Sequence, residues 1–161
     1  MDNAFEFFKQ QMEIKKQEQI KKDLEYGLEM ETKICPIIEN HFQVKLHKTS
    51  QYSHEDWLAE NGTYFELKSR PSILPTTYST QIFPVYKVKI GATHPLILVY
   101  HFSRTNETFY IVYNKEKFSK YQTRMIEACR RTIQPIEHFE IPFTDFIKIY
   151  PLRLGFLNLK S

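Results

Sequence analysis

The sequence changes at Val44 from a helix-forming part to a strand-forming part, and this change limits the folds open to the chain. Residues 2–42 are rich in strong helix formers with charges of alternating sign, which predicts a helix. Within this stretch, a break is expected near Gly27 or Pro36, because proline removes a helix hydrogen bond. Beyond Val44, runs rich in β-branched and aromatic residues predict strands over 44–49, 52–59, 63–69, 96–102 and 108–113.

The remaining segments complete an α/β pattern on the border of α+β. Residues 71–84 are rich in proline, threonine and serine and predict a loop, with room for a short helix. Residues 115–130 predict a second helix, and 138–150 predict a mixed strand and turn segment. This order predicts a mixed central β-sheet flanked by helices. The 161 residues fit one domain, 1–161, in which 1–26 forms an N-terminal helical extension.

Composition excludes several classes of protein. Hydrophobic residues make up 42% and charged residues 25%, which excludes disordered and collagen-like chains. The four glycines form neither of the glycine-rich motifs that cradle phosphates. Cys35 and Cys129 form no CxxC pair, so no zinc site is expected, and free thiols are favoured over a disulfide. No apolar run reaches signal or membrane-span length, so we expect a soluble, intracellular protein without a membrane partner.

Charge permits a polyanionic partner without requiring one. The formal net charge is +3. Residues 104–131 concentrate seven basic side chains against three glutamates. A phosphate-binding patch and an ordinary solvated face both remain open for this segment.

A β-hairpin is predicted around Glu60-Asn61-Gly62, and two registers compete for it. A two-residue Asn61-Gly62 turn would place Asp56 opposite Leu67. A three-residue loop with Gly62 in the left-handed region would place Asp56 opposite Glu66 instead. We favour the second register, because it separates polar from apolar side chains more cleanly between the two faces.

In this register two carboxylates, Asp56 and Glu66, lie side by side with the Lys68 ammonium on the same face. Like charges opposite each other on a sheet repel, and a divalent cation would relieve that repulsion. Oxygen ligands of this kind suit Mg²⁺, Mn²⁺ or Ca²⁺ better than zinc. The alternative is a solvated strand face with an ordinary ion pair between Glu66 and Lys68.

One face of the predicted first helix carries a single carboxylate. The spacing places on this face Leu24, Leu28, Glu31, Cys35 and Ile38. A charge on a buried stripe is costly unless it is paired or bound to a metal. Glu31 is therefore either a site residue or an edge residue that reaches solvent. Gly27, one turn earlier, would permit close approach of another backbone.

Together, these positions resemble the motif of the PD-(D/E)XK nuclease superfamily. Helix residues Gly27 and Glu31, strand Asp56 and then Glu66-Leu67-Lys68 match its order and spacing, within a resemblance over about 24–100. More loosely, the chain resembles small stand-alone members of large DNA viruses and phages. Two features depart from the pattern. Glu55 replaces the proline before Asp56, and Gln81 and Tyr86 are one residue too far apart for the Q-x-x-x-Y motif of some members.

The resemblance implies a restriction-endonuclease-like fold and a nuclease that depends on Mg²⁺, with Mn²⁺ as a substitute. It implies that the metal ligands are Asp56, Glu66, the Leu67 carbonyl and Glu31, the last directly or through water. Lys68 would orient the attacking water and offset negative charge. Arg70 and Lys87 are candidate contacts to backbone phosphates, and DNA is favoured over RNA. A viral member would act in the host cytoplasm or nucleus.

Two other functions remain open. The same fold could bind nucleic acid without cutting it, because fold does not dictate activity. Alternatively, the chain is a non-nucleolytic interaction protein in which helix 2–26 contacts a partner. The apolar positions of that helix would suit a homodimer or packing on the chain's own sheet; they are Phe5, Phe8, Met12, Ile20 and Leu24.

Overall fold

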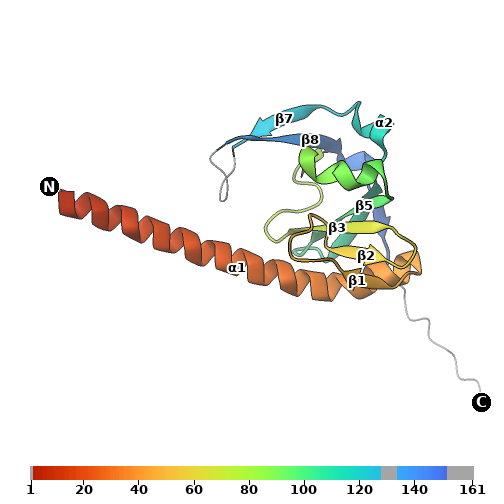
Figure 1. Cartoon of the computed structure of the whole chain (residues 1–161), viewed down its shortest axis with the longest axis horizontal. Coiled ribbons are helices and arrows are strands. Elements are labelled where there is room, and N and C mark those ends of the chain that lie inside the picture. Colours follow the sequence, from red (N-terminus) through yellow and green to blue (C-terminus); the bar gives the residue numbers. More distant parts are fainter. Residues whose placement is uncertain (1, 128–133, 152–161) are drawn as a thin grey trace, which may run out of the picture.

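The structure is a computed structural model that describes residues 2–127 and 134–151. It is an α+β protein that combines a long N-terminal helix, a mixed six-stranded sheet and a small antiparallel sheet (Figure 1). Its helical elements are α1 (Asp2–Phe42), η1 (Val85–Ala92), α2 (Lys115–Phe118) and η2 (Phe143–Asp145). Its strands are β1 (Leu46–Lys48), β2 (Trp57–Ala59), β3 (Tyr64–Arg70), β4 (Thr80–Pro84), β5 (Leu96–Phe102), β6 (Glu107–Val112), β7 (Thr123–Ile126), β8 (Ile136–Pro142) and β9 (Ile147–Ile149).

The central sheet has the strand order β1-β2-β3-β5-β6-β9. Its pair β3–β5 is parallel and the other pairs are antiparallel, so the prediction of a mixed sheet is confirmed. Strand β5 is buried along its whole length, as expected for the middle of a sheet covered on both faces. The second sheet, ordered β4-β8-β7, was not predicted.

Alternating residues of the central strands belong to two hydrophobic clusters, one on each face of the central sheet. On one face, Met30, Ile34 and Ile38 of α1 pack with Phe65 and other residues of the strands. On the other face, a larger cluster joins β5 to the small sheet and includes Phe83, Leu98, Tyr100, Phe102, Phe118, Phe139 and Ile141. Figure 1 shows this arrangement, with α1 on one side of the sheet and β7 and β8 on the other. Only the α1 face is therefore covered by a long helix.

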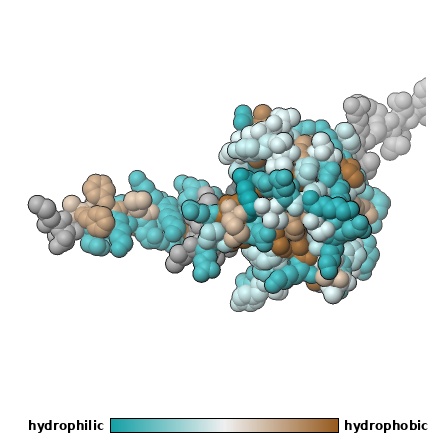
Figure 2. Space-filling view, turned by 90° about the horizontal axis from the view of Figure 1, so that it is seen from above, coloured by the Kyte–Doolittle hydropathy of each residue, from teal (hydrophilic) through white to brown (hydrophobic). Residues whose placement is uncertain are grey.

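Helix α1 is continuous, so the predicted break at Gly27 or Pro36 is wrong. The predicted buried stripe is also shifted. Leu24 and Leu28 are 54% and 46% exposed, whereas Ile34 and Ile38 are fully buried. The reason is that the first part of α1 extends beyond the sheet, as Figures 1 and 2 show, so nothing covers its apolar side chains there.

The expected close backbone approach at Gly27 is likewise not found. A Cβ built at this position would meet no described atom within 4 Å. Gly27 instead borders a cavity that is described below.

Three segments differ from the sequence prediction because tertiary pairing or local turns decide them. Residues 80–84 of the predicted loop form β4, which pairs with β8. The predicted helix 115–130 stops at Phe118, and Thr123–Ile126 then forms β7 against β8. Such pairing overrides intrinsic helix propensity. The predicted strand 52–59 is limited to Trp57–Ala59, because turns bonded to Ser50 precede it. Residues 128–130 of the predicted helix, with Cys129, lie outside the described residues.

The burial of His101 in β5 leads us to expect that the free energy of unfolding depends on pH. The residue is fully buried, and its Nδ1 lies 3.0 Å from Thr108 Oγ1. Burial, with a smaller effect of Lys33, lowers the pKa of His101 from its ordinary 6.5 to about 4. Between these values the unfolded chain binds a proton that the folded chain does not. The free energy of unfolding should therefore fall, as pH drops from 6.5 towards 4, by up to about 1.4 kcal/mol per pH unit.

The measurement is urea unfolding of wild type and His101→Gln at several pH values from 7 to 4.5. Other groups contribute to the slope in both proteins, so the informative quantity is the difference between the two curves. The wild type should lose stability faster on acidification than the variant. Parallel curves would contradict the assignment of this proton to His101.

Candidate functional site

The β2–β3 hairpin has the favoured register. Trp57 pairs with Phe65 and Leu58 with Tyr64, and Gly62 has a φ of 84° in the left-handed region. The loop therefore has three residues, as predicted, and glycine adopts its conformation without the penalty of a side chain. One residue before β2, the Asp56 amide donates to the Phe65 carbonyl at 2.9 Å. Phe65 is already the partner of Trp57, so the regular pairing ends there and Asp56 is not paired one-to-one with Glu66. The Asp56 carboxylate nevertheless lies close enough to Glu66 for the charge of Glu66 to raise its pKa.

Asp56 is fixed to β3 by a hydrogen bond from the backbone. Its Oδ2 accepts from the Leu67 amide at 2.6 Å. Burial and, next, the charge of the neighbouring Glu66 raise the pKa of Asp56 to about 7, although the hydrogen bond from the Leu67 amide acts to lower it. A nearby cation would further stabilise the charged form of this carboxyl.

Glu66 is the centre of the cluster and is only 3% exposed. Its Oε1 accepts hydrogen bonds from Lys68 Nζ and from Lys87 Nζ, both at 2.7 Å. Its Oε2 is buried and has no hydrogen-bond partner among the described residues. Oε1 therefore accepts hydrogen bonds from two ammonium groups, whereas Oε2 accepts none and could still accept a hydrogen bond or bind a cation.

The two lysines differ in their surroundings. Burial lowers the pKa of Lys68; Glu66 opposes this shift, while the charge of Lys87 adds to it. Burial also acts to lower the pKa of Lys87, but the Glu66 carboxylate outweighs it and the net shift is upward. Lys87 comes from η1 and also lies 3.4 Å from the His54 carbonyl. The lysine expected to contact phosphate therefore contacts the acidic cluster directly in this structure.

Glu31 occupies a separate position near the cluster. It forms an ion pair with Lys48 of β1 at 2.5 Å and is mostly shielded from solvent. Its charge reaches Asp56 strongly enough to raise the pKa of that carboxyl. Within the described ranges, however, no three or more His, Cys, Asp or Glu side chains are grouped so that they could hold a metal ion. The sequence predicted the residue but not its Lys48 partner, which comes from an edge strand.

The donor set nevertheless fits a hard divalent cation at its centre. Asp56 and Glu66 supply two carboxylates, and the unpartnered Oε2 of Glu66 is the kind of atom that such a cation would complete. The Leu67 backbone carbonyl is the third donor that the resemblance implies. Oxygen ligands of these types suit Mg²⁺ and Mn²⁺.

A cavity of about 430 Å³ lies between α1 and the end of β3. Its walls include Tyr26, Gly27, Glu31, Leu67 and Arg70. The lack of a side chain at Gly27 helps to keep this space open. Glu31 and Leu67 of the predicted site and Arg70, a predicted phosphate contact, therefore line one hollow, whereas Asp56 and Glu66 are not part of its lining.

Arg70 is held in place by its neighbours. Its guanidinium lies 5.4 Å from the centre of the Tyr100 ring, and its Nη2 donates to the Ile82 carbonyl at 3.4 Å. Burial raises the pKa of Tyr100, so this phenol stays neutral beneath the guanidinium. A positive side chain is thus fixed near the acidic cluster.

No family model matches the chain, and no curated protein matches it. None of the helices in the described part of the chain has the length and apolar character that crossing a membrane requires.

Proposed function

We propose that this chain is a metal-dependent nuclease of the PD-(D/E)XK type with a restriction-endonuclease-like fold, which hydrolyses phosphodiester bonds of DNA. The observation that carries the proposal is the buried Glu66, whose Oε2 has no partner among the described residues while Asp56 and Lys68 lie beside it. A structural ion pair would not require a second, partly buried carboxylate at this point. A cation-binding site would.

The residues of the cluster have different roles in the proposed reaction. Asp56, Glu66 and the Leu67 carbonyl hold Mg²⁺ or Mn²⁺. When bound, such an ion lowers the pKa of a coordinated water and offsets charge on the scissile phosphate. The Lys68 ammonium orients the attacking water and stabilises negative charge that develops on the phosphate. Glu31 supplies a further oxygen, directly or through water, once its carboxylate is released from Lys48.

A second candidate function is binding of nucleic acid without cleavage. It is favoured by the two ammonium groups that already neutralise Glu66 Oε1. Lysines in these positions provide a counter-charge without any metal. Distinguishing the two functions requires cleavage and binding to be measured separately.

The experiment incubates the full chain with plasmid, linear, single-stranded and branched DNA and with RNA. Each substrate is tested with Mg²⁺, with Mn²⁺ and with EDTA. We expect cleavage of DNA with either metal and none with EDTA. Glu66→Gln should abolish cleavage, because it removes the charge while retaining an oxygen for the two lysines.

Glu60→Gln is the matched control, because Glu60 lies in the loop of the same hairpin and its side chain is 70% exposed. It should cut like the wild type. Retained binding with no cleavage by the wild type in any lane would favour the second candidate function. Cleavage that survives Glu66→Gln would contradict the assignment of this cluster as the active site.

A further inference from the structure

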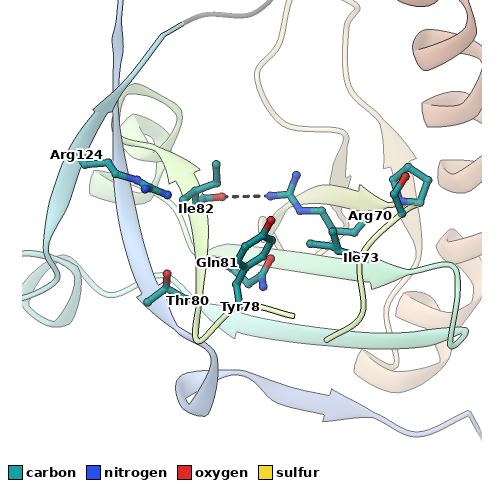
Figure 3. A pocket seen from close by; sticks show the side chains of 9 residues that line it. Arg70, Ile73, Tyr78, Thr80, Gln81, Ile82 and Arg124 are labelled. Carbon is teal, nitrogen blue, oxygen red and sulfur yellow. Dashed lines mark hydrogen bonds between the residues drawn. The ribbon is translucent and has the colours of Figure 1, made fainter. Parts of the chain in front are cut away.

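A second cavity, of about 530 Å³, lies where the end of β3 faces β4 and β7 (Figure 3). Its lining includes Arg70, Ile73, Tyr78, Gln81, Ile82 and Arg124. Figure 3 shows the two arginines on either side of Tyr78 in this view, with Arg70 bonded to the Ile82 carbonyl. The volume lies in the range of roughly 300–1,000 Å³ that is typical of ligand-binding sites.

The two arginines of this cavity, which we call the arginine cavity, come from different sheets. Arg70 ends β3 of the central sheet, and Arg124 belongs to β7 of the small sheet. Arg124 is held by its Nε, which lies 3.2 Å from Glu140 Oε1, and its side chain is 58% exposed. This contact orients the guanidinium while its planar fork remains suited to a phosphate.

Two buried polar atoms in the wall have no hydrogen-bond partner in the described part of the chain. They are Arg70 Nε and Gln81 Nε2. Gln81 is only 2% exposed, so water does not readily satisfy its amide. Both atoms are donors, and buried donors of this kind are normally paired. Both atoms are enclosed in the wall, so they make it polar, and a ligand with acceptor oxygens or ring nitrogens would pair with them only after a small shift of these side chains.

The remaining wall suits a flat ring. Tyr78 is 59% exposed although its ring borders the cavity, and Ile73 and Ile82 add apolar surface. An exposed aromatic ring beside a cationic side chain is typical of surfaces on which bases of single strands stack. The combination of two arginines, an amide donor and a tyrosine therefore matches a nucleotide rather than a simple anion.

We propose that the arginine cavity binds one unpaired nucleotide of a nucleic-acid strand, with its phosphate towards Arg70 and Arg124 and its base against Tyr78. The assignment deepens the proposed nuclease function and rests on it. Arg70 and Pro71 line both this cavity and the hollow that contains Glu31 and Leu67. A strand with one nucleotide in the arginine cavity can thus pass Arg70 and present a neighbouring phosphate to the carboxylate cluster.

The substrate class follows from the shape of the site. A base inside the arginine cavity cannot at the same time pair within a duplex. The enzyme should therefore prefer single-stranded DNA, or the unpaired strand of a flap or branch, over fully paired DNA.

The test measures binding of a fluorescently labelled single-stranded 12-mer, and of the same sequence as a duplex, by anisotropy in EDTA. The protein is the full chain with Glu66→Gln, so that binding is separated from cleavage. Adding Arg124→Gln or Tyr78→Leu should weaken single-strand binding about 10-fold, the effect expected when one stacked base is lost. Duplex binding should change by less than about threefold, because non-specific phosphate contacts elsewhere carry it. Deoxyadenosine 5′-monophosphate should compete with the single strand.

The controls are Lys120→Gln and Tyr150→Leu, which remove one exposed cation and one exposed tyrosine, 72% exposed in each case, outside the cavity lining. Variants of the arginine cavity that bind and cut like these controls would overturn this inference while leaving the nuclease proposal intact. If the cavity variants lose single-strand binding and the wild type cuts no substrate, the nucleotide site would be supported and the nuclease proposal would be contradicted. Absence of any single-strand binding by the parent protein would also overturn the inference.

Discussion

Replacing Lys68 with methionine should lower metal-dependent cleavage by at least about 100-fold, the scale of losing one charge-stabilising donor in an active site. The reason is that Lys68 lies within the motif that resembles the nuclease superfamily and donates directly to Glu66. Methionine keeps much of the length and volume of the side chain while removing its charge. Binding of nucleic acid should stay within about threefold of wild type, since Lys68 acts on charge that develops during the reaction and one positive charge among several contributes little to non-specific affinity.

Lys87→Met is the matched comparison for this variant. Both lysines donate to the same Glu66 oxygen at 2.7 Å, and their side chains are 23% and 20% exposed. If Lys68 acts only by neutralising Glu66, the two variants should lose the same activity. If its position towards the scissile phosphate matters, Lys68→Met should lose far more turnover than Lys87→Met.

The measurement is single-turnover cleavage of the preferred substrate at saturating Mg²⁺, beside anisotropy for binding. Thermal unfolding of each variant shows whether the fold is retained. Equal cleavage rates for Lys68→Met and wild type would contradict a catalytic role for Lys68.

Replacing Ile34 with alanine should lower the free energy of unfolding by about 2–5 kcal/mol, the usual cost of truncating a buried aliphatic side chain. Ile34 is fully buried where α1 packs on the central sheet. Its loss leaves a cavity between the helix and strands that carry the site. The same variant should therefore also weaken the docking of Glu31 beside Asp56.

Leu24→Ala is the control on the same helix. Leu24 is 54% exposed, so its truncation should change stability by no more than about 0.5 kcal/mol. Urea unfolding followed by the fluorescence of buried Trp57 measures both variants. Equal destabilisation by the two substitutions would show that the first part of α1 is packed in solution, against the structure.

The hairpin shows what could be predicted from sequence. Its register followed from two local facts, the alternation of polar and apolar residues and a glycine suited to a left-handed turn. Both act within a few residues, so the pairing of Trp57 with Phe65 was accessible from sequence alone, whereas the departure from regular pairing at Asp56 was not. The strand Leu96–Phe102 was equally clear, because all of its residues except His101 are aliphatic or aromatic.

The features that sequence missed depend on distant partners. Strands β4 and β7 exist because β8 lies between them, and neither has a strong strand pattern of its own. Lys87 reaches Glu66 across 21 residues of sequence, and Glu31 of α1 pairs with Lys48 of the edge strand β1. The stripe on α1 was misplaced for the same reason, since periodicity indicates which faces of a helix are apolar but not where the sheet beneath it ends.

The parallel pairing of β3 with β5 also sets the order in which the chain can fold. Parallel strands cannot be joined by a tight turn, and here the crossover between them carries β4 and η1. The hairpin that brings Asp56 to Glu66 is local and can form early, whereas Lys87 arrives only when the crossover closes. Non-local pairing of this kind is slow. Before that step, Asp56 and Glu66 would lack Lys87, one of the two lysines that neutralise Glu66. The site is therefore complete only when the crossover has folded, so activity should appear at the same rate as the folded state.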